Sequence, residues 1–238
     1  MTNKKQPLTA IYYMIFASLL IAGTTIISKL LGTDKLGPSL NPMQISHSRF
    51  FFAFILIFFF FMNTKSKIYK PNYKIHISRS FFGWLGITIL FGASSIISVS
   101  DATALIFINP IFTMLLAIPF LGEKIKAFKW LAAIVTFAGA IILIRPENNL
   151  FQIKLINIIL ILGALALGLE SILIKILTQK EKPSQILLVN NGIGLIISSF
   201  PIFFIWITPN FKQFLAFFFY RVSNALCTNL LYSGNEKK

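Results

Sequence analysis

Apolar residues in this chain gather into long runs, and short polar segments rich in lysine separate them. A helix needs about 20 residues to cross roughly 30 Å of hydrocarbon, and its backbone polar groups must be paired within it. Seven runs fit such helices, and a weaker eighth follows. We expect helices at 11–31, 43–62, 80–98, 102–121, 128–144, 154–177, 187–208 and 211–220. The pattern predicts an all-α integral membrane protein, a polytopic helical bundle of about seven or eight spans.

Composition supports the membrane assignment. Of the 238 residues 56% are hydrophobic and only 12% are charged, with a mean hydropathy of +0.78. A soluble domain has roughly 45–50% apolar and about 25% charged residues. The net charge of +15 is typical of nucleic-acid binding proteins, but here the basic residues lie in bursts between apolar runs. We therefore expect membrane lipids as partners and no nucleic acid.

The distribution of Lys and Arg predicts an orientation. Twelve of them lie in the N-terminus and in every second loop, against four in the opposite loops. Cytoplasmic loops carry the excess of positive charge. The N-terminus is therefore predicted to be cytoplasmic.

Two short motifs recur in the same order. The first predicted helix ends in SKLL (Ser28–Leu31) and the sixth in IKIL (Ile174–Leu177). The second begins with Pro-x-Gln-Ile at 42–45 and the seventh with the same motif at 183–186. Duplication of a five-helix unit would insert its second copy upside down, as in many secondary transporters. We predict a first repeat at 1–146, a partial second repeat at 147–220 and a polar tail at 221–238.

The segment from Asp101 to Pro146 resembles the EamA domain of the drug/metabolite transporter superfamily. The likeness lies in the start of the fourth helix at Asp101–Ala104, the mid-helix Pro110, the Gly122–Glu123 exit and Gly139. The strings ISKLLG (27–32) and HSRFFFA (47–53) extend it to about 8–146, and a looser likeness covers 147–208. SKLLGT and SRFFF are also similar to the carriers that take up S-adenosylmethionine.

The resemblance implies a bacterial inner-membrane secondary transporter of a small polar metabolite, such as S-adenosylmethionine or a similar amino-acid-derived solute. Such a carrier works by alternating access and needs no cofactor, and a homodimer is an expected assembly. Family members have ten helices, and no counterparts of the last two follow Tyr220 here. The alternative is a non-transporting truncated remnant, or a subunit that acts only within a complex.

Ionisable residues within spans are the first candidates for substrate binding, because each costs about 2.5–3.5 kcal/mol on insertion scales. Arg49 lies about seven residues into its predicted helix, roughly 10 Å from the boundary at 1.5 Å per residue. It could hold a carboxylate or phosphate in a bidentate manner, or pair with an acidic residue. Glu170 could exchange a proton during transport, or serve as the counter-ion of Arg49.

Three further residues complete the candidate site. Asn109 and Pro110 lie in the middle of the run at 102–121, where proline removes a backbone hydrogen bond and kinks the helix. The freed carbonyl could face a cavity, or the kink could serve packing alone. Lys29 lies near the outer end of its helix, within reach of the interface, and is equally a ligand candidate or an interfacial residue.

Catalytic and metal chemistry find no support in the sequence. Cys227 is the only cysteine, and His47 and His76 lie far in sequence from acidic residues. Neither a phosphate-binding glycine loop nor a nucleophile elbow occurs. We expect no enzyme and no metal site.

Overall fold

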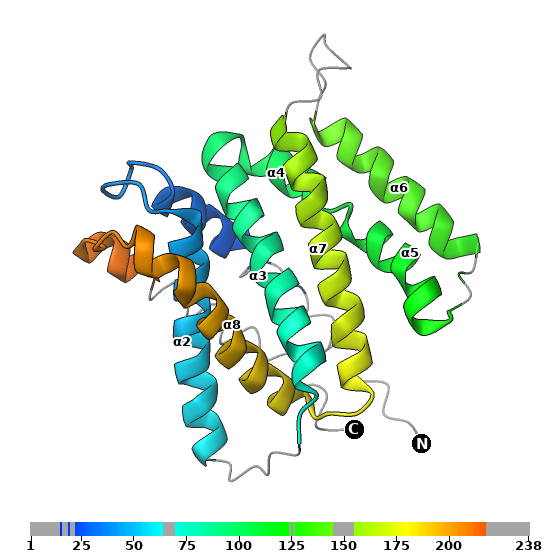
Figure 1. The fold of residues 1–238 in the computed structure, drawn as a ribbon. Coiled ribbons are helices and arrows are strands. Elements are labelled where there is room, and N and C mark those ends of the chain that lie inside the picture. The colour runs from blue at the N-terminus through cyan, green and yellow to red at the C-terminus, as the bar shows by residue number, and fades with distance from the viewer. Residues whose placement is uncertain are drawn as a thin grey trace, which may run out of the picture.

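The computed structural model describes residues 15, 19, 22–63, 70–123, 125, 127–144 and 155–217. All regular structure within these residues is helical (Figure 1). The helices are α2 (Pro42–Asn63), α3 (Tyr73–Ile96), α4 (Val99–Ile106), α5 (Asn109–Leu121), α6 (Ala127–Ile144), α7 (Leu155–Thr178) and α8 (Pro183–Ile205). Further helical stretches cover 22–31 before α2 and 211–217 after α8.

Five segments are long and apolar enough to cross a membrane, with α4 and α5 counted together as Val99–Leu121. α6 adds a shorter apolar helix at Ala127–Gly139. The prediction of an all-α, multi-pass membrane protein is confirmed. Parts of the first and eighth predicted helices, and the tail at 221–238, lie outside the described residues.

The third and seventh predicted helices begin earlier than expected. α3 begins at Tyr73 rather than 80, because the side chain of Asn72 caps it by accepting a hydrogen bond from the amide of Ile75. α8 begins at Pro183 rather than 187, and proline suits the first turn because its missing N–H has no partner there. The residues before each apolar run are polar, and the sequence pattern therefore predicts loops there.

The prediction of one kinked but continuous fourth helix is wrong. Phe107 and Ile108 interrupt the helix, and α5 begins at Asn109 with Pro110 in its first turn. Pro110 therefore stands where a missing N–H costs nothing, and not in the middle of a continuous helix. The chain breaks into two helices at this point.

The centre of the bundle is the antiparallel packing of α3 against α7. Cβ atoms added to Gly86 and Gly163 would lie 2.6 Å from Leu167 Cγ and 2.9 Å from Ile89 Cγ2. Side chains at these glycines would force the two helices apart. Small residues let helix backbones approach closely in membranes, where van der Waals packing drives helix association.

α2 packs against α8 in the same antiparallel manner (Figure 1). A Cβ atom on Gly194 of α8 would overlap the ring of Phe50 of α2. Gln44 in the first turn of α2 donates to the carbonyl of Ile207 at 2.6 Å and accepts from its amide at 3.3 Å. The beginning of α2 is thereby attached to the chain that follows α8.

Both Pro-x-Gln-Ile motifs occupy equivalent places. Pro42 and Pro183 each begin a helix, and the glutamine and isoleucine that follow are at most 2% exposed in both copies. The two helices run in opposite directions (Figure 1). This is the arrangement that an inverted duplication would produce.

Candidate substrate-binding site

A buried ion pair joins α3 to α7 at the centre of the bundle. Arg79 Nη2 lies 3.9 Å from Glu170 Oε1, and the two side chains are 7% and 22% exposed. This separation exceeds that of an N–H···O hydrogen bond, so the contact is electrostatic. The predicted helix at 80–98 leaves Arg79 in the loop before it, among the twelve basic residues counted for the orientation. It lies instead inside α3, among the buried residues of that helix.

Gly83 makes room for the carboxylate. It lies one turn after Arg79 on α3, and a Cβ atom there would be 2.7 Å from the carboxyl carbon of Glu170 and 2.9 Å from Oε1. Any side chain at this position would displace the carboxylate. The helix pair is thus shaped around Glu170.

Arg49 on α2 contributes a third charge. Its half-buried side chain lies close enough for its charge to act on Glu170, with a weaker effect than that of Arg79. The hypothesis that Glu170 is the counter-ion of Arg49 is therefore corrected, because the ion pair is formed by Arg79. The Glu170 carboxylate thus lies within electrostatic range of two guanidinium groups, and the three groups together carry a net positive charge.

Uncharged polar groups extend this cluster across α2, α3 and α8. Ser80 donates to Asn190 Oδ1 at 2.9 Å, and Thr88 donates to Ser46 Oγ at 2.9 Å. His47 Nδ1 lies 2.9 Å from Ser198 Oγ. Polar side chains within spans usually face the bundle interior or a solvent-filled cavity. Three hydrogen-bonded pairs of polar side chains therefore link these helices within the spans.

Lys29 lies apart from the charged cluster. Its ammonium donates to the carbonyl of Ile97 at 3.2 Å, at the C-terminal end of α3. A cation is favourable there because the unpaired carbonyls carry partial negative charge. Gly83 adjoins the Glu170 carboxylate, and Ile97 follows it by 14 residues. Lys29 therefore lies about 21 Å from the charged cluster along the helix axis, at 1.5 Å per residue.

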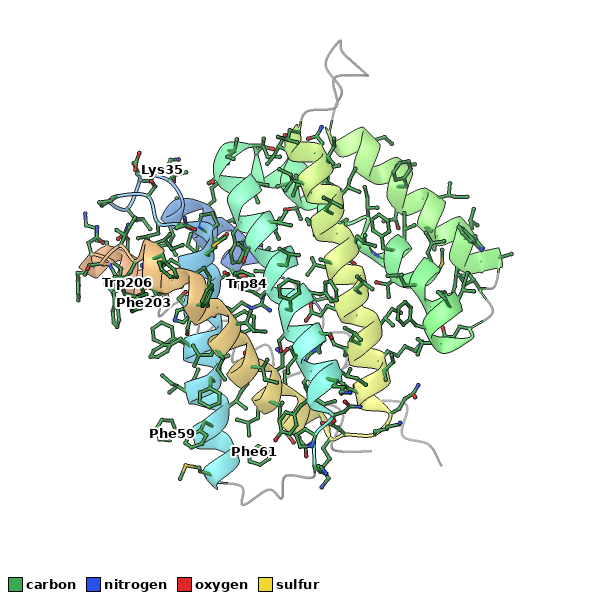
Figure 2. The ribbon with its side chains drawn as sticks, viewed as in Figure 1. Lys35, Phe59, Phe61, Trp84, Phe203 and Trp206 are labelled. Carbon is green, nitrogen blue, oxygen red and sulfur yellow. The ribbon has the colours of Figure 1, made fainter. Side chains whose placement is uncertain are left out.

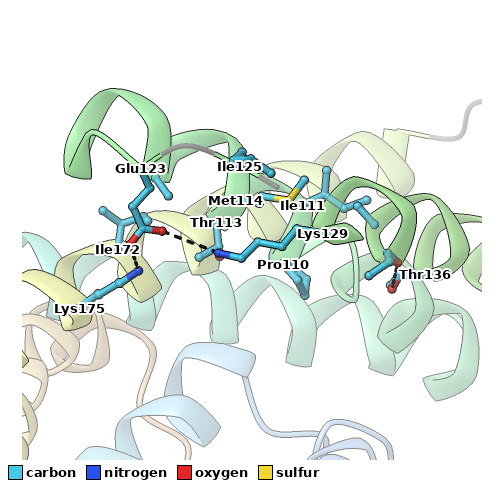
Figure 3. A pocket seen from close by; sticks show the side chains of 13 residues that line it. Pro110, Ile111, Thr113, Met114, Glu123, Ile125, Lys129, Thr136, Ile172 and Lys175 are labelled. Carbon is cyan, nitrogen blue, oxygen red and sulfur yellow. Dashed lines mark hydrogen bonds and ion pairs between the residues drawn. The ribbon is translucent and has the colours of Figure 1, made fainter. Parts of the chain in front are cut away.

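Asn109 and Pro110 also lie apart from the cluster, on the side of α7 that faces α5. The carbonyl of Asn109 is 3.4 Å from the place that a Cβ on Gly168 would take. Pro110 lines a cavity of about 330 Å³ between α5, α6 and α7 (Figure 3). Of the five predicted site residues, the structure brings together only Arg49 and Glu170.

An ion-pair group closes one side of that cavity. Glu123, just after α5, binds Lys175 of α7 by a short hydrogen bond and lies 4.0 Å from Lys129 of α6 (Figure 3). The hydrogen bond from Lys175 is the main reason that the pKa of Glu123 is lowered, and the charges of both lysines add to it.

A second charged network joins the beginning of α3 to the loop between α7 and α8. Glu181 accepts hydrogen bonds from His76 Nε2 at 2.9 Å, from the Asn72 amide at 3.0 Å and from Gln185 Nε2 at 2.9 Å. Burial acts to raise the pKa of Glu181, but these hydrogen bonds and the His76 charge outweigh it, and the pKa is lowered. His76 is fully buried. Its isolation in the sequence is therefore no guide to its surroundings, since its partner lies 105 residues away.

Comparison with known proteins identifies the family. Residues 8–145 match the model of the EamA-like transporter family. The chain belongs to this family. It is therefore a transporter-family protein and not an enzyme, as the sequence predicted.

Relatives of known function show more than one substrate. The chain is 26% identical to the S-adenosylmethionine uptake transporter of Rickettsia felis over 207 residues, 87% of this chain and 68% of the relative. It is 27% identical to that of Rickettsia bellii, over 82% of this chain and 67% of the relative. It is 31% identical to the riboflavin transporter of Rhizobium johnstonii over 111 residues, 47% of this chain and 36% of the relative.

Proposed function

We propose that the chain moves a small polar metabolite across the membrane as a secondary transporter, by alternating access. The first candidate solute is S-adenosylmethionine or a similar amino-acid derivative. The observation that carries this proposal is the group of Arg49, Arg79 and Glu170 inside the spans. Burying charged groups in a membrane is costly, and they mark solute and ion pathways more often than packing sites.

The charges suit an amino-acid head group. A guanidinium binds a carboxylate through two parallel hydrogen bonds, and Arg49 is the half-buried guanidinium of the cluster. The carboxylate of Glu170 is 22% exposed and can accept from an ammonium or lie against a sulfonium. S-adenosylmethionine carries all three of these groups. Riboflavin carries none of them, so the cluster favours the former substrate.

The network around Glu181 supports the alternating-access part of the proposal. It joins α3 to the connection between α7 and α8 at one end of the bundle (Figure 1). A carrier must close each end of its path in turn. Opening this end would require the two hydrogen bonds to the carboxylate that come from α3 and its cap, those of His76 and the Asn72 amide, to break.

We further propose a bacterial inner membrane with the N-terminus in the cytoplasm, on the basis of the charge asymmetry. A reporter fused after Thr64 should then be cytoplasmic and one fused after Asn148 external. The reverse pattern would contradict this orientation.

A homodimer is proposed as well, and crosslinking of the reconstituted chain would test it.

The substrate is tested by uptake into cells that express the chain. Labelled S-adenosylmethionine and labelled riboflavin are supplied separately, with a Glu170→Gln variant of equal abundance as the control. Saturable uptake of S-adenosylmethionine that Glu170→Gln removes is the expected result. Uptake of riboflavin alone would reject the amino-acid-derived substrate, and uptake of neither would reject both solutes.

A further inference from the structure

A second cavity, distinct from the charged cluster, lies between α2 and the chain that follows α8, beside Trp206 (Figure 2). It has a volume of about 220 Å³. Five aromatic side chains line it, together with Gln44, His47, Ser48 and Pro209; they are Phe51, Phe52, Trp206, Phe214 and Phe217. Pockets that hold a whole drug-sized ligand are about 300–1,000 Å³. This cavity therefore suits one ring system of a larger molecule.

Hydrogen bonds join the segments that form the walls of the cavity. The amide group of Gln44 is bonded on both sides to the backbone of Ile207, which holds the 206–217 segment against α2. At the start of 211–217, Asn210 and Gln213 bind the carbonyls of Leu36 and Pro38. Preorganised walls reduce the entropy lost on binding.

Three of the lining rings pack against one another in edge-to-face contacts. Phe52 lies edge-on to Phe51 at 80° and to Phe214 at 67°. Flat heteroaromatic rings bind well in such surroundings, because stacked and edge-to-face contacts both add to the burial of area. An alkyl chain would gain the burial alone.

His47 adds a polar group to this apolar cavity. Its Nδ1 is engaged by Ser198, whose hydroxyl also reaches the carbonyl of Leu195 at 3.2 Å. With the hydroxyl proton directed to that carbonyl, His47 carries its own proton on Nδ1. Nε2 is then a hydrogen-bond acceptor, which matches an exocyclic amine on a ring.

We propose that this cavity binds an amino-substituted nitrogen heterocycle, the ring portion of the transported molecule. The inference rests on the proposed function, because it takes the cavity as a subsite for the same solute. Arg49 follows His47 by two residues on α2. One helix thus presents residues to both subsites, the ring in the aromatic cavity and the charged head group at the buried cluster.

Binding of tritiated adenosine to the purified full chain in phospholipid nanodiscs tests the proposal, measured by scintillation proximity. Adenosine carries the ring and lacks the amino-acid head group. We expect saturable binding that Phe214→Leu weakens about tenfold, the scale of one lost base–aromatic stack. Phe211→Leu is the matched control, because Phe211 lies on the same helical stretch, is 76% exposed and does not line the cavity.

Inosine, which has a carbonyl in place of the amine, should bind more weakly than adenosine, and His47→Phe should remove that preference. Thermal unfolding of each variant confirms that it is folded. Absence of saturable binding by the folded unmodified chain would overturn the proposal, as would equal weakening by Phe211→Leu and Phe214→Leu. If S-adenosylmethionine uptake persists without adenosine binding, the ring subsite fails and the transport function stands. If adenosine binds but no solute is taken up, the transport function fails and the ring subsite stands.

Discussion

The place of a Cβ atom on Gly83 lies 2.7 Å from the carboxyl carbon of Glu170. The absence of a side chain on α3 is therefore what allows a carboxylate on α7 to sit between two membrane-spanning helices. Real Cβ atoms do not approach a heavy atom so closely, so a methyl group here must move the carboxylate or part the helices. Gly83 therefore sets where the Glu170 carboxylate can lie.

Gly83→Ala should reduce uptake on the order of tenfold or more, because small displacements of a binding group have large effects on rate. Initial uptake rates at equal protein abundance measure this. Gly92→Ala is the matched control on the same helix, where the added atom would lie 3.4 Å from Pro42 Cγ, an ordinary contact. Equal uptake rates for the two variants would show that the space at Gly83 is not needed for solute binding.

Removing one member of the Arg79–Glu170 pair should destabilise the protein more than removing both. Arg79→Gln leaves a carboxylate among the helices, and loss of one partner of a buried pair costs about 3–5 kcal/mol. We expect about 3 kcal/mol, the lower end of that range, because Glu170 is partly exposed. The unfolding temperature measured in detergent should be lower for Arg79→Gln than for the double variant that also carries Glu170→Gln. The opposite ranking would show that the pair contributes little.

Arg49→Lys should impair uptake although the charge is kept. A lysine ammonium is a point charge and cannot form the two parallel hydrogen bonds that a guanidinium makes with a carboxylate. The apparent affinity for the solute should fall about tenfold or more, for the loss of one charge-assisted hydrogen bond worth about 1.5–3 kcal/mol. Unchanged uptake by Arg49→Ala would exclude Arg49 as a ligand.

Stability should fall at acid pH through Glu181. Its pKa is lower in the folded protein than in an unfolded chain, so its contribution is complete above the unfolded value of about 4.3 and is lost as the pH falls through the folded value. Unfolding temperatures measured between pH 3 and pH 7 should therefore drop below about pH 4.3, and Glu181→Gln should flatten that part of the curve. Lys212→Gln, which removes an exposed charge from the helical stretch at 211–217, serves as the control.

The helices and the family could be predicted from the sequence because lipid imposes long apolar runs, and local patterns report these directly. The helix starts at Tyr73 and Pro183 were missed because the first turns there are polar and resemble loop. The break before Pro110 was read as a kink, since a proline alone does not say whether the helix continues past it.

The site was only half predictable, because its contacts depend on how helices distant in sequence pack. Arg49 and Glu170 stood out as charges inside apolar runs. Arg79 did not, because it adjoins a lysine-rich loop, and its burial follows from the glycines that bring α3 close to α7. The pairing of His76 with Glu181 links residues 105 positions apart, and no local pattern reports it.

Solute counterflow in proteoliposomes tests the transport function most directly. The full chain is reconstituted into vesicles loaded with unlabelled S-adenosylmethionine, and uptake of a trace of labelled S-adenosylmethionine is followed. A carrier that alternates between two faces should accumulate the label transiently above its external concentration, and Glu170→Gln should abolish this at equal protein content. Label that only equilibrates passively, at the same rate with the Glu170→Gln protein or in vesicles without protein, would contradict transport by this chain.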